Sequence, residues 1–153
     1  MSRVLFTILA LLLVTEARAE NPAPYSGTEI VDTGRPFDAY VTSLLAAVKS
    51  NGMGVVAQAC ATCGAKSIGV TIPGNRVIMI FNPHFAVRML KASVAAGVEA
   101  PLRLYVVELA NGTARLSYRL PSHAFAPYAV PARDEMAREL DAILARIVAD
   151  AGQ

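Results

Sequence analysis

The stretch RVIMIFNPHFAVRMLKASVAA, residues 76–96, decides the predicted fold, because a strand pattern changes to a helix pattern within it. Residues 76–81 are apolar and rich in β-branched side chains, which is typical of a buried strand. At the boundary, Asn82 can cap a helix and Pro83 fits its first turn, where no backbone donor is missed. Apolar residues then recur every three or four positions, as on one face of a helix: Phe85, Met89, Ala92 and Ala96. The sequence therefore predicts a strand that ends just before Asn82 and a helix that starts at Pro83.

The first 19 residues have the pattern of a secretory signal peptide. Arg3 supplies the positive charge, residues 4–14 are apolar, and Ala17-Arg18-Ala19 is an A-x-A cleavage site. The apolar run is too short for a membrane anchor, since eleven residues rise only about 16 Å as a helix. We therefore expect cleavage near Ala19, no stable membrane span afterwards, and a periplasmic or secreted protein. Residues 20–27 contain proline and glycine and are expected to form a flexible lead.

The mature chain is expected to form one small domain. Removing 19 of the 153 residues leaves 134, which is enough for a single hydrophobic core. Without Arg3, Arg18 and Glu16, the charged side chains are 12 basic and 11 acidic, so the net charge is +1. No cluster of Lys and Arg is present, and the composition therefore gives no reason to expect nucleic acid as a partner.

Four more strands and two more helices follow from the same kind of pattern. The strands are expected over residues 28–33, 54–59, 102–110 and 113–120, and the helices over residues 37–48 and from residue 132 onward. Residues 66–74 are expected to be a loop or a single helical turn, and residues 121–131 an irregular connection. The order β-α-β-β-α-β-β-α predicts one α+β domain over residues 28–150, with helices packed on one face of a mainly antiparallel sheet.

Asn111-Gly112, between the last two strands, is the clearest hairpin signal in the sequence. Both residues tolerate the positive φ of a type I′ turn, which would place Ala110 opposite Thr113. In that register Glu108 faces Arg115 across the two strands, and we expect a structural ion pair between them. The alternative for Glu108 is a buried acid, because its neighbours are apolar.

One face of this hairpin is expected to remain outside the core. A sheet face that mixes apolar and arginine side chains suits self-association or a partner protein. We expect this face to carry Leu104, Val106, Ser117 and Arg119.

Three sequence features together resemble the small bacterial and archaeal family called domain of unknown function family 302. They are Phe81-Asn82-Pro83, then Ala100-Pro101-Leu102-Arg103, and finally Leu116-Ser117-Tyr118 with Pro121. The resemblance covers residues 28–122. It implies a compact α+β fold and a tendency to oligomerise. It implies no established activity, so no catalytic residue is carried over.

Cys60 and Cys63 are the only cysteines, and they form a C-x-x-C pair at the end of a predicted strand. In an exported protein such a pair has three alternative roles. It forms a plain local disulfide, or it acts as a redox pair, or the two cysteines are metal ligands or unpaired thiols. No histidine follows Cys63 directly, so the motif is not a c-type haem attachment site.

A soft-metal site at these cysteines would need further ligands. We expect His123 to leave the sheet at the same edge as Cys60 and Cys63, with Met53 or another methionine as a soft fourth ligand for copper. The alternative for His123 is a solvent-facing or capping residue. His84 is expected at the opposite edge, as a surface residue in the first turn of a helix.

Two classes of function are consistent with these features. The first is an exported binding or interaction module that self-associates or takes a partner protein or small ligand. The second is a thiol-redox or metal-handling accessory protein that uses Cys60 and Cys63. An enzyme of acyl or phosphoryl transfer is not indicated, because there is neither a G-x-S-x-G motif nor a phosphate-binding glycine loop. The sequence identifies no cofactor.

Overall fold

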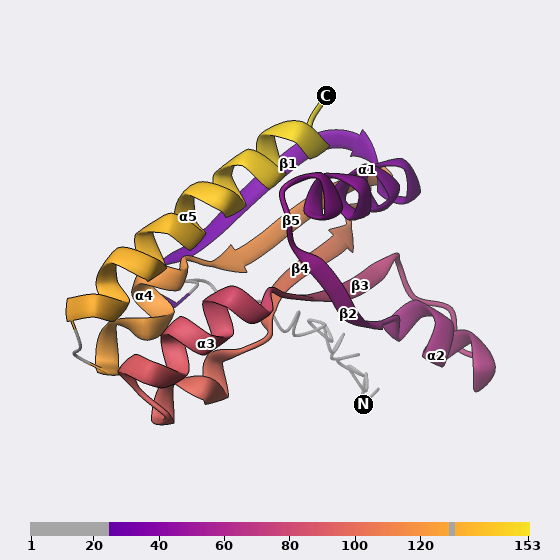
Figure 1. The fold of residues 1–153 in the computed structure, drawn as a ribbon. Coiled ribbons are helices and arrows are strands. Elements are labelled where there is room, and N and C mark those ends of the chain that lie inside the picture. Colours follow the sequence, from indigo (N-terminus) through magenta and orange to yellow (C-terminus); the bar gives the residue numbers. More distant parts are fainter. Residues whose placement is uncertain (1–24, 129–130) are drawn as a thin grey trace, which may run out of the picture.

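An antiparallel sheet of five strands forms one layer, and helices lie across one of its faces (Figure 1). The computed structural model describes residues 25–128 and 131–153. The strand order in the sheet is β1-β5-β4-β3-β2. The strands are β1 (Thr28–Pro36), β2 (Gly54–Ala59), β3 (Asn75–Phe81), β4 (Leu102–Glu108) and β5 (Thr113–Arg119).

Helices connect most of the strands, and a helix is the last element of the chain. They are α1 (Phe37–Ser50), α2 (Ala61–Ser67), α3 (Pro83–Ala92), α4 (Pro121–Phe125) and α5 (Pro131–Ala151), with 3₁₀ turns at Ala95–Glu99 and Ala126–Tyr128. The predicted α+β class and mainly antiparallel sheet are confirmed. Residues 1–24, which include the predicted signal peptide and most of the predicted lead, lie outside the described residues. Among the described helices, none is both long and apolar enough to cross a membrane.

The change from strand to helix occurs at the predicted dipeptide. β3 ends at Phe81, and the Oδ1 atom of Asn82 accepts the backbone N–H of His84 at 2.9 Å. The Nδ2 atom of Asn82 donates to the carbonyl oxygen of Gly52 at 2.8 Å, so the same side chain also holds the turn before β2. The helix ends earlier than its pattern suggests, and Ala96 reaches the core from the following 3₁₀ turn.

The core lies between the sheet and the helices α1 and α5. The apolar stripes predicted for these helices pack onto alternate residues of the strands. The buried side chains include Leu44, Val48, Ile78, Ile80, Leu104, Val106, Leu116, Leu144 and Ile147. Successive side chains of a strand point to opposite faces of the sheet. Because Leu104 and Val106 point into the core, the residues between them on β4 lie on the open face.

The turn between β4 and β5 differs from the predicted type I′ turn. The N–H of Leu109 donates to the oxygen of Thr113, and the N–H of Gly112 donates to the oxygen of Leu109, both at 2.8 Å. The loop therefore has three residues, and Gly112 takes the left-handed position with φ 80°. The Oδ1 atom of Asn111 accepts the N–H of Thr113 at 3.1 Å, a local bond that favours this form of turn.

The extra loop residue shifts the register by one, and the predicted pair of Glu108 and Arg115 is wrong as a result. Glu108 lies opposite Ala114 instead of Arg115, and its carboxylate accepts the N–H of Gly74 at 2.7 Å. Arg115 points to the other face, where its Nη2 atom donates to Asp32 of β1 at 2.9 Å.

The sheet face expected to be open is also corrected. Leu104 and Val106 have no exposed surface and belong to the core. The open face carries Arg103 and Tyr105 of β4 instead, next to Ser117 and Arg119, which were predicted there correctly.

The two short helices α2 and α4 were not predicted. α2 starts directly after Cys60, before the residues for which a loop or turn was expected. α4 forms inside the proline-rich connection, where the N–H of Ser122 donates to Asp141 of α5 at 3.0 Å. Both helices are too short to show a helical period in the sequence.

The observed register can be tested through the pKa of Asp32. The hydrogen bond from Arg115 favours the charged carboxylate and lowers the pKa of Asp32 below its ordinary value of 3.8. We expect Arg115→Gln to return the pKa of Asp32 towards 3.8, and the control Glu108→Gln to leave it unchanged, in an NMR titration of the carboxyl carbon. The folded pKa is the lower one, so the pair stabilises the fold above the unfolded pKa and loses this effect as the pH falls through the folded pKa. A pKa of Asp32 that responds to Glu108→Gln and not to Arg115→Gln would contradict this register.

Candidate functional site

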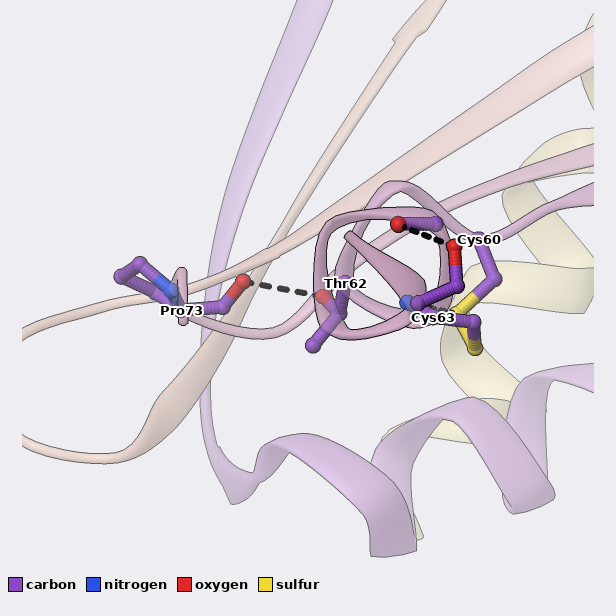
Figure 2. The surroundings of a disulfide bond; sticks show 6 residues. Cys60, Thr62, Cys63 and Pro73 are labelled. Carbon is purple, nitrogen blue, oxygen red and sulfur yellow. Dashed lines mark hydrogen bonds between the residues drawn. A yellow bond between two sulfur atoms is a disulfide. The ribbon is translucent and has the colours of Figure 1, made fainter. Parts of the chain in front are cut away.

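A disulfide joins Cys60 and Cys63 at the point where β2 ends and α2 begins (Figure 2). Cys60 has an extended backbone and caps the helix, since its sulfur accepts the N–H of Cys63 at 3.0 Å. Cys60 is half-buried and Cys63 is exposed. A reagent in solution therefore reaches Cys63 more easily than Cys60.

The helix that carries the disulfide is attached to the domain at its edge. α2 extends from the end of β2, away from the helices that cover the sheet (Figure 1), and none of its residues is buried. Its Thr62 hydroxyl donates to the carbonyl oxygen of Pro73 at 3.0 Å, as Figure 2 shows. This bond links α2 to the loop that returns to β3.

Gly74 fixes the end of that loop. Its N–H donates to the Oε2 atom of Glu108 at 2.7 Å, and its oxygen accepts the N–H of Glu108 at 2.8 Å. A Cβ atom at this position would lie 2.7 Å from ring carbons of Phe37, which is closer than such atoms approach in real proteins. Glycine at position 74 therefore lets the loop pass Phe37 and hold the carboxylate of Glu108 in place.

An open cleft of about 210 Å³ lies beside the disulfide. Three charged residues line it together with both cysteines: Asp38 from the first turn of α1, Arg76 from β3 and Glu108 from β4. Asp38 is exposed, and Arg76 and Glu108 are half-buried. The Nε atom of Arg76 is buried and has no hydrogen-bond partner among the described residues. The cleft thus combines a reducible bond, two carboxylates and a guanidinium.

Both histidines lie at the other end of the sheet, so the predicted edge for His123 is wrong. β3 and β5 both pair antiparallel with β4, and they therefore run in the same direction, opposite to β2. His84 follows β3 and His123 follows β5, whereas Cys60 follows β2. His123 is exposed and lies against Gly27, where an added Cβ atom would be 2.2 Å from the imidazole Cγ.

The predicted soft-metal ligands are therefore not brought together. Met53 is buried before the start of β2, at the end of that strand away from Cys60. Among the described residues there is no group of three or more His, Cys, Asp or Glu that could hold a metal ion.

Sequence reasoning found the cysteines and singled out Glu108, but it missed Asp38 and Arg76. Asp38 was only part of a predicted helix, and Arg76 only marked the start of a predicted strand. One signal was available, because Arg76 is the only charged residue in the apolar run RVIMIF. Its partners in the cleft come from separate segments, and their proximity has no local signature in the sequence.

Comparisons with known proteins agree on the fold. A family model described as Domain of unknown function DUF302 matches residues 29–151. The crystal structure of an uncharacterized conserved DUF302 protein from Bacillus stearothermophilus is similar, with a TM-score of 0.73 and 23% sequence identity. The alignment covers 82% of this chain and 98% of that chain. At this identity the likeness supports the fold alone. No curated protein matches the chain.

The contact between Gly74 and Phe37 can be tested by adding a methyl group. We expect Gly74→Ala to lower the free energy of unfolding by about 1–3 kcal/mol, because the new Cβ atom displaces Phe37 or the loop. Gly64→Ala in α2 is the matched control, since nothing lies within 4 Å of its added Cβ atom. That change should leave stability equal or raise it by up to about 1 kcal/mol. Urea unfolding of both variants gives the comparison, and equal effects would contradict the close contact.

Proposed function

The chain belongs to the DUF302 family. We propose that it is an exported protein that carries out thiol–disulfide exchange at Cys60 and Cys63. The family description assigns no activity, so the proposal rests on the site itself. The observation that supports it best is the position of the disulfide, which joins a half-buried and an exposed cysteine at the wall of an open cleft.

A purely structural role explains this disulfide poorly. It closes a loop of only four residues, which on the chain-entropy model contributes about 2 kcal/mol. The helix α2 that it anchors contributes no residue to the core. Opening the bond should therefore leave the rest of the domain intact, as repeated oxidation and reduction requires.

The two cysteines differ in a way that suits exchange. A thiolate attacks the sulfur of Cys63, the more exposed residue, the bond between the two cysteines breaks, and Cys60 leaves as a thiolate. The N–H of Cys63, 3.0 Å from the Cys60 sulfur, stabilises that negative charge. A second thiolate then attacks the mixed disulfide at its outer sulfur, which releases a small disulfide and leaves both cysteines reduced. Two electrons pass from the two thiols to the protein, and the reverse sequence oxidises it.

Redox exchange is favoured over metal handling at this site. Reduced Cys60 and Cys63 supply two soft ligands, but a closed site for zinc or copper needs more. The described residues bring no histidine or further cysteine to this end of the sheet.

Export completes the proposal. The leader-like residues 1–19 and the C-x-x-C pair both suit an oxidising compartment, the periplasm or the outside medium. The mass of the mature protein, isolated from fractions of the producing cell, tests this point.

A second candidate function is self-association, and the edge strand β2 favours it. All six residues of β2 are exposed, and the sequence GVVAQA contains neither a charge nor a proline. The other edge, β1, carries Glu29, Asp32, Arg35 and Pro36, which is how proteins commonly protect an edge. We propose that β2 pairs antiparallel with β2 of a second copy, since an uncharged strand meets no repulsion from its own sequence.

Thiol exchange at Cys63 can be tested with single-cysteine variants. With 2-hydroxyethyl disulfide, Cys60→Ser should accumulate a mixed disulfide at Cys63, because no second thiol resolves it. At a pH where both thiols are ionised, Cys63→Ser should react about tenfold more slowly, since Cys60 is less exposed. Mass spectrometry follows both reactions. A wild-type disulfide with a potential below about −300 mV, which glutathione fails to reduce, would contradict the proposal.

Pairing through β2 can be tested with a charge on the strand. Val56 is 54% exposed, and we expect Val56→Lys to reduce the mass measured by light scattering from that of a dimer to that of a monomer. Ile30→Lys on β1 is the matched control, because Ile30 is 48% exposed on the edge that is already charged. A wild-type protein that remains monomeric at about 100 μM would contradict this pairing.

A further inference from the structure

The charged groups of the cleft bear on which thiols it can bind. Arg76 is half-buried and lines the cleft, and its guanidinium forms no ion pair with any described residue. An anionic group that enters the cleft gives this charge a partner. A carboxylate is the most suitable group, because it matches the planar guanidinium in shape and charge.

The same cleft carries negative charge as well. Glu108 is held by the N–H of Gly74 through one carboxylate oxygen, and the exposed Asp38 adds a second carboxylate. A simple anion would meet two negative groups beside Arg76, and a simple cation would leave the positive charge of Arg76 without a partner. A molecule with both charges satisfies both sets of groups.

We infer that the cleft binds a small zwitterionic thiol of the amino-acid class. Its carboxylate pairs with Arg76, its ammonium group lies near Asp38 and Glu108, and its sulfur reaches the disulfide. The half-buried Ile72 and the buried Phe37 supply apolar walls, and the cleft volume of about 210 Å³ accommodates a molecule of this size. This inference rests on the proposed thiol exchange and adds the class of substrate.

The overall reaction balances without a further reagent. Two molecules of the amino-acid thiol lose one proton and one electron each and become joined by a disulfide bond. The protein disulfide takes up the two electrons and two protons and becomes two thiols. Arg76, Asp38 and Glu108 act only by binding and positioning the small molecule.

The first experiment compares rates of reduction by four thiols: cysteine, cysteamine, 3-mercaptopropionate and 2-mercaptoethanol. Each rate is divided by the concentration of the thiolate form and corrected for the dependence of its nucleophilicity on the pKa of the thiol. We expect cysteine to react at least tenfold faster than the other three, which lack the carboxylate, the ammonium group or both.

Variants of the cleft separate the contributions of the two charges. Arg76→Gln should lower the rate with cysteine about tenfold more than the rate with 2-mercaptoethanol, because the 2-mercaptoethanol thiolate loses only the general attraction of the positive charge. Asp38→Asn should slow cysteine but accelerate 3-mercaptopropionate, because one repelling carboxylate is gone. Arg103→Gln, an exposed arginine on the opposite face of the sheet, is the control and should change none of the rates. Circular dichroism verifies that each variant is folded.

A second experiment uses S-methylcysteine, which keeps both charges but cannot exchange. We expect it to shift the amide NMR signals of Asp38 and Gly74, and Arg76→Gln to abolish the shifts. Equal rates for the four thiols, with no binding of S-methylcysteine, would overturn the zwitterion inference and leave thiol exchange standing. The opposite result is that S-methylcysteine binds but none of the four thiols reduces the disulfide. That result would overturn the proposed exchange, and the bound molecule would then not be a substrate.

Discussion

The register between β4 and β5 determines what both faces of the sheet can do. Side chains alternate along a strand, so a shift of one residue would exchange the two faces. The three-residue loop that ends at Gly112 sets this register. It places Leu104 and Val106 among the helices and directs Glu108 towards Gly74. The same register leaves Arg115 on the open face, within reach of Asp32.

The direction of the strands then decides which chemical groups meet. Because every neighbouring pair is antiparallel, the chain leaves β2 and β4 at the end of the sheet where it enters β3. The disulfide, Arg76 and Glu108 gather at this end, and α1 starts there with Asp38. Both histidines follow strands that end on the other side. The same topology that builds the cleft therefore separates the cysteines from the expected metal ligands.

The disulfide is at the margin of the domain, and this position matters for its chemistry. The core between the sheet, α1 and α5 contains no residue of α2. A change in the redox state of Cys60 and Cys63 therefore affects only a helix that does not pack into the core. Thr62 and Gly74 connect that helix to the cleft through the loop before β3, so the reactive bond and the charged groups keep a defined relation.

The sequence by itself determined the features that depend on neighbouring residues. The bounds of β2, the end of β3 at Phe81, and the cap at Asn82 were all predicted correctly, because propensity and capping act over a few residues. The apolar stripe of α1 was equally clear, since a helical period needs only three turns to be recognised.

The tertiary structure alone decided the features that join distant segments. The bond between Gly74 and Glu108 spans 34 positions, and the pair of Asp32 and Arg115 spans 83. The turn at Asn111-Gly112 was recognised, but its length was not, because the dipeptide is compatible with loops of two or three residues. That single residue changed the partner of Glu108. A local pattern fixes where a strand lies, whereas its neighbours and its register depend on packing against the whole sheet.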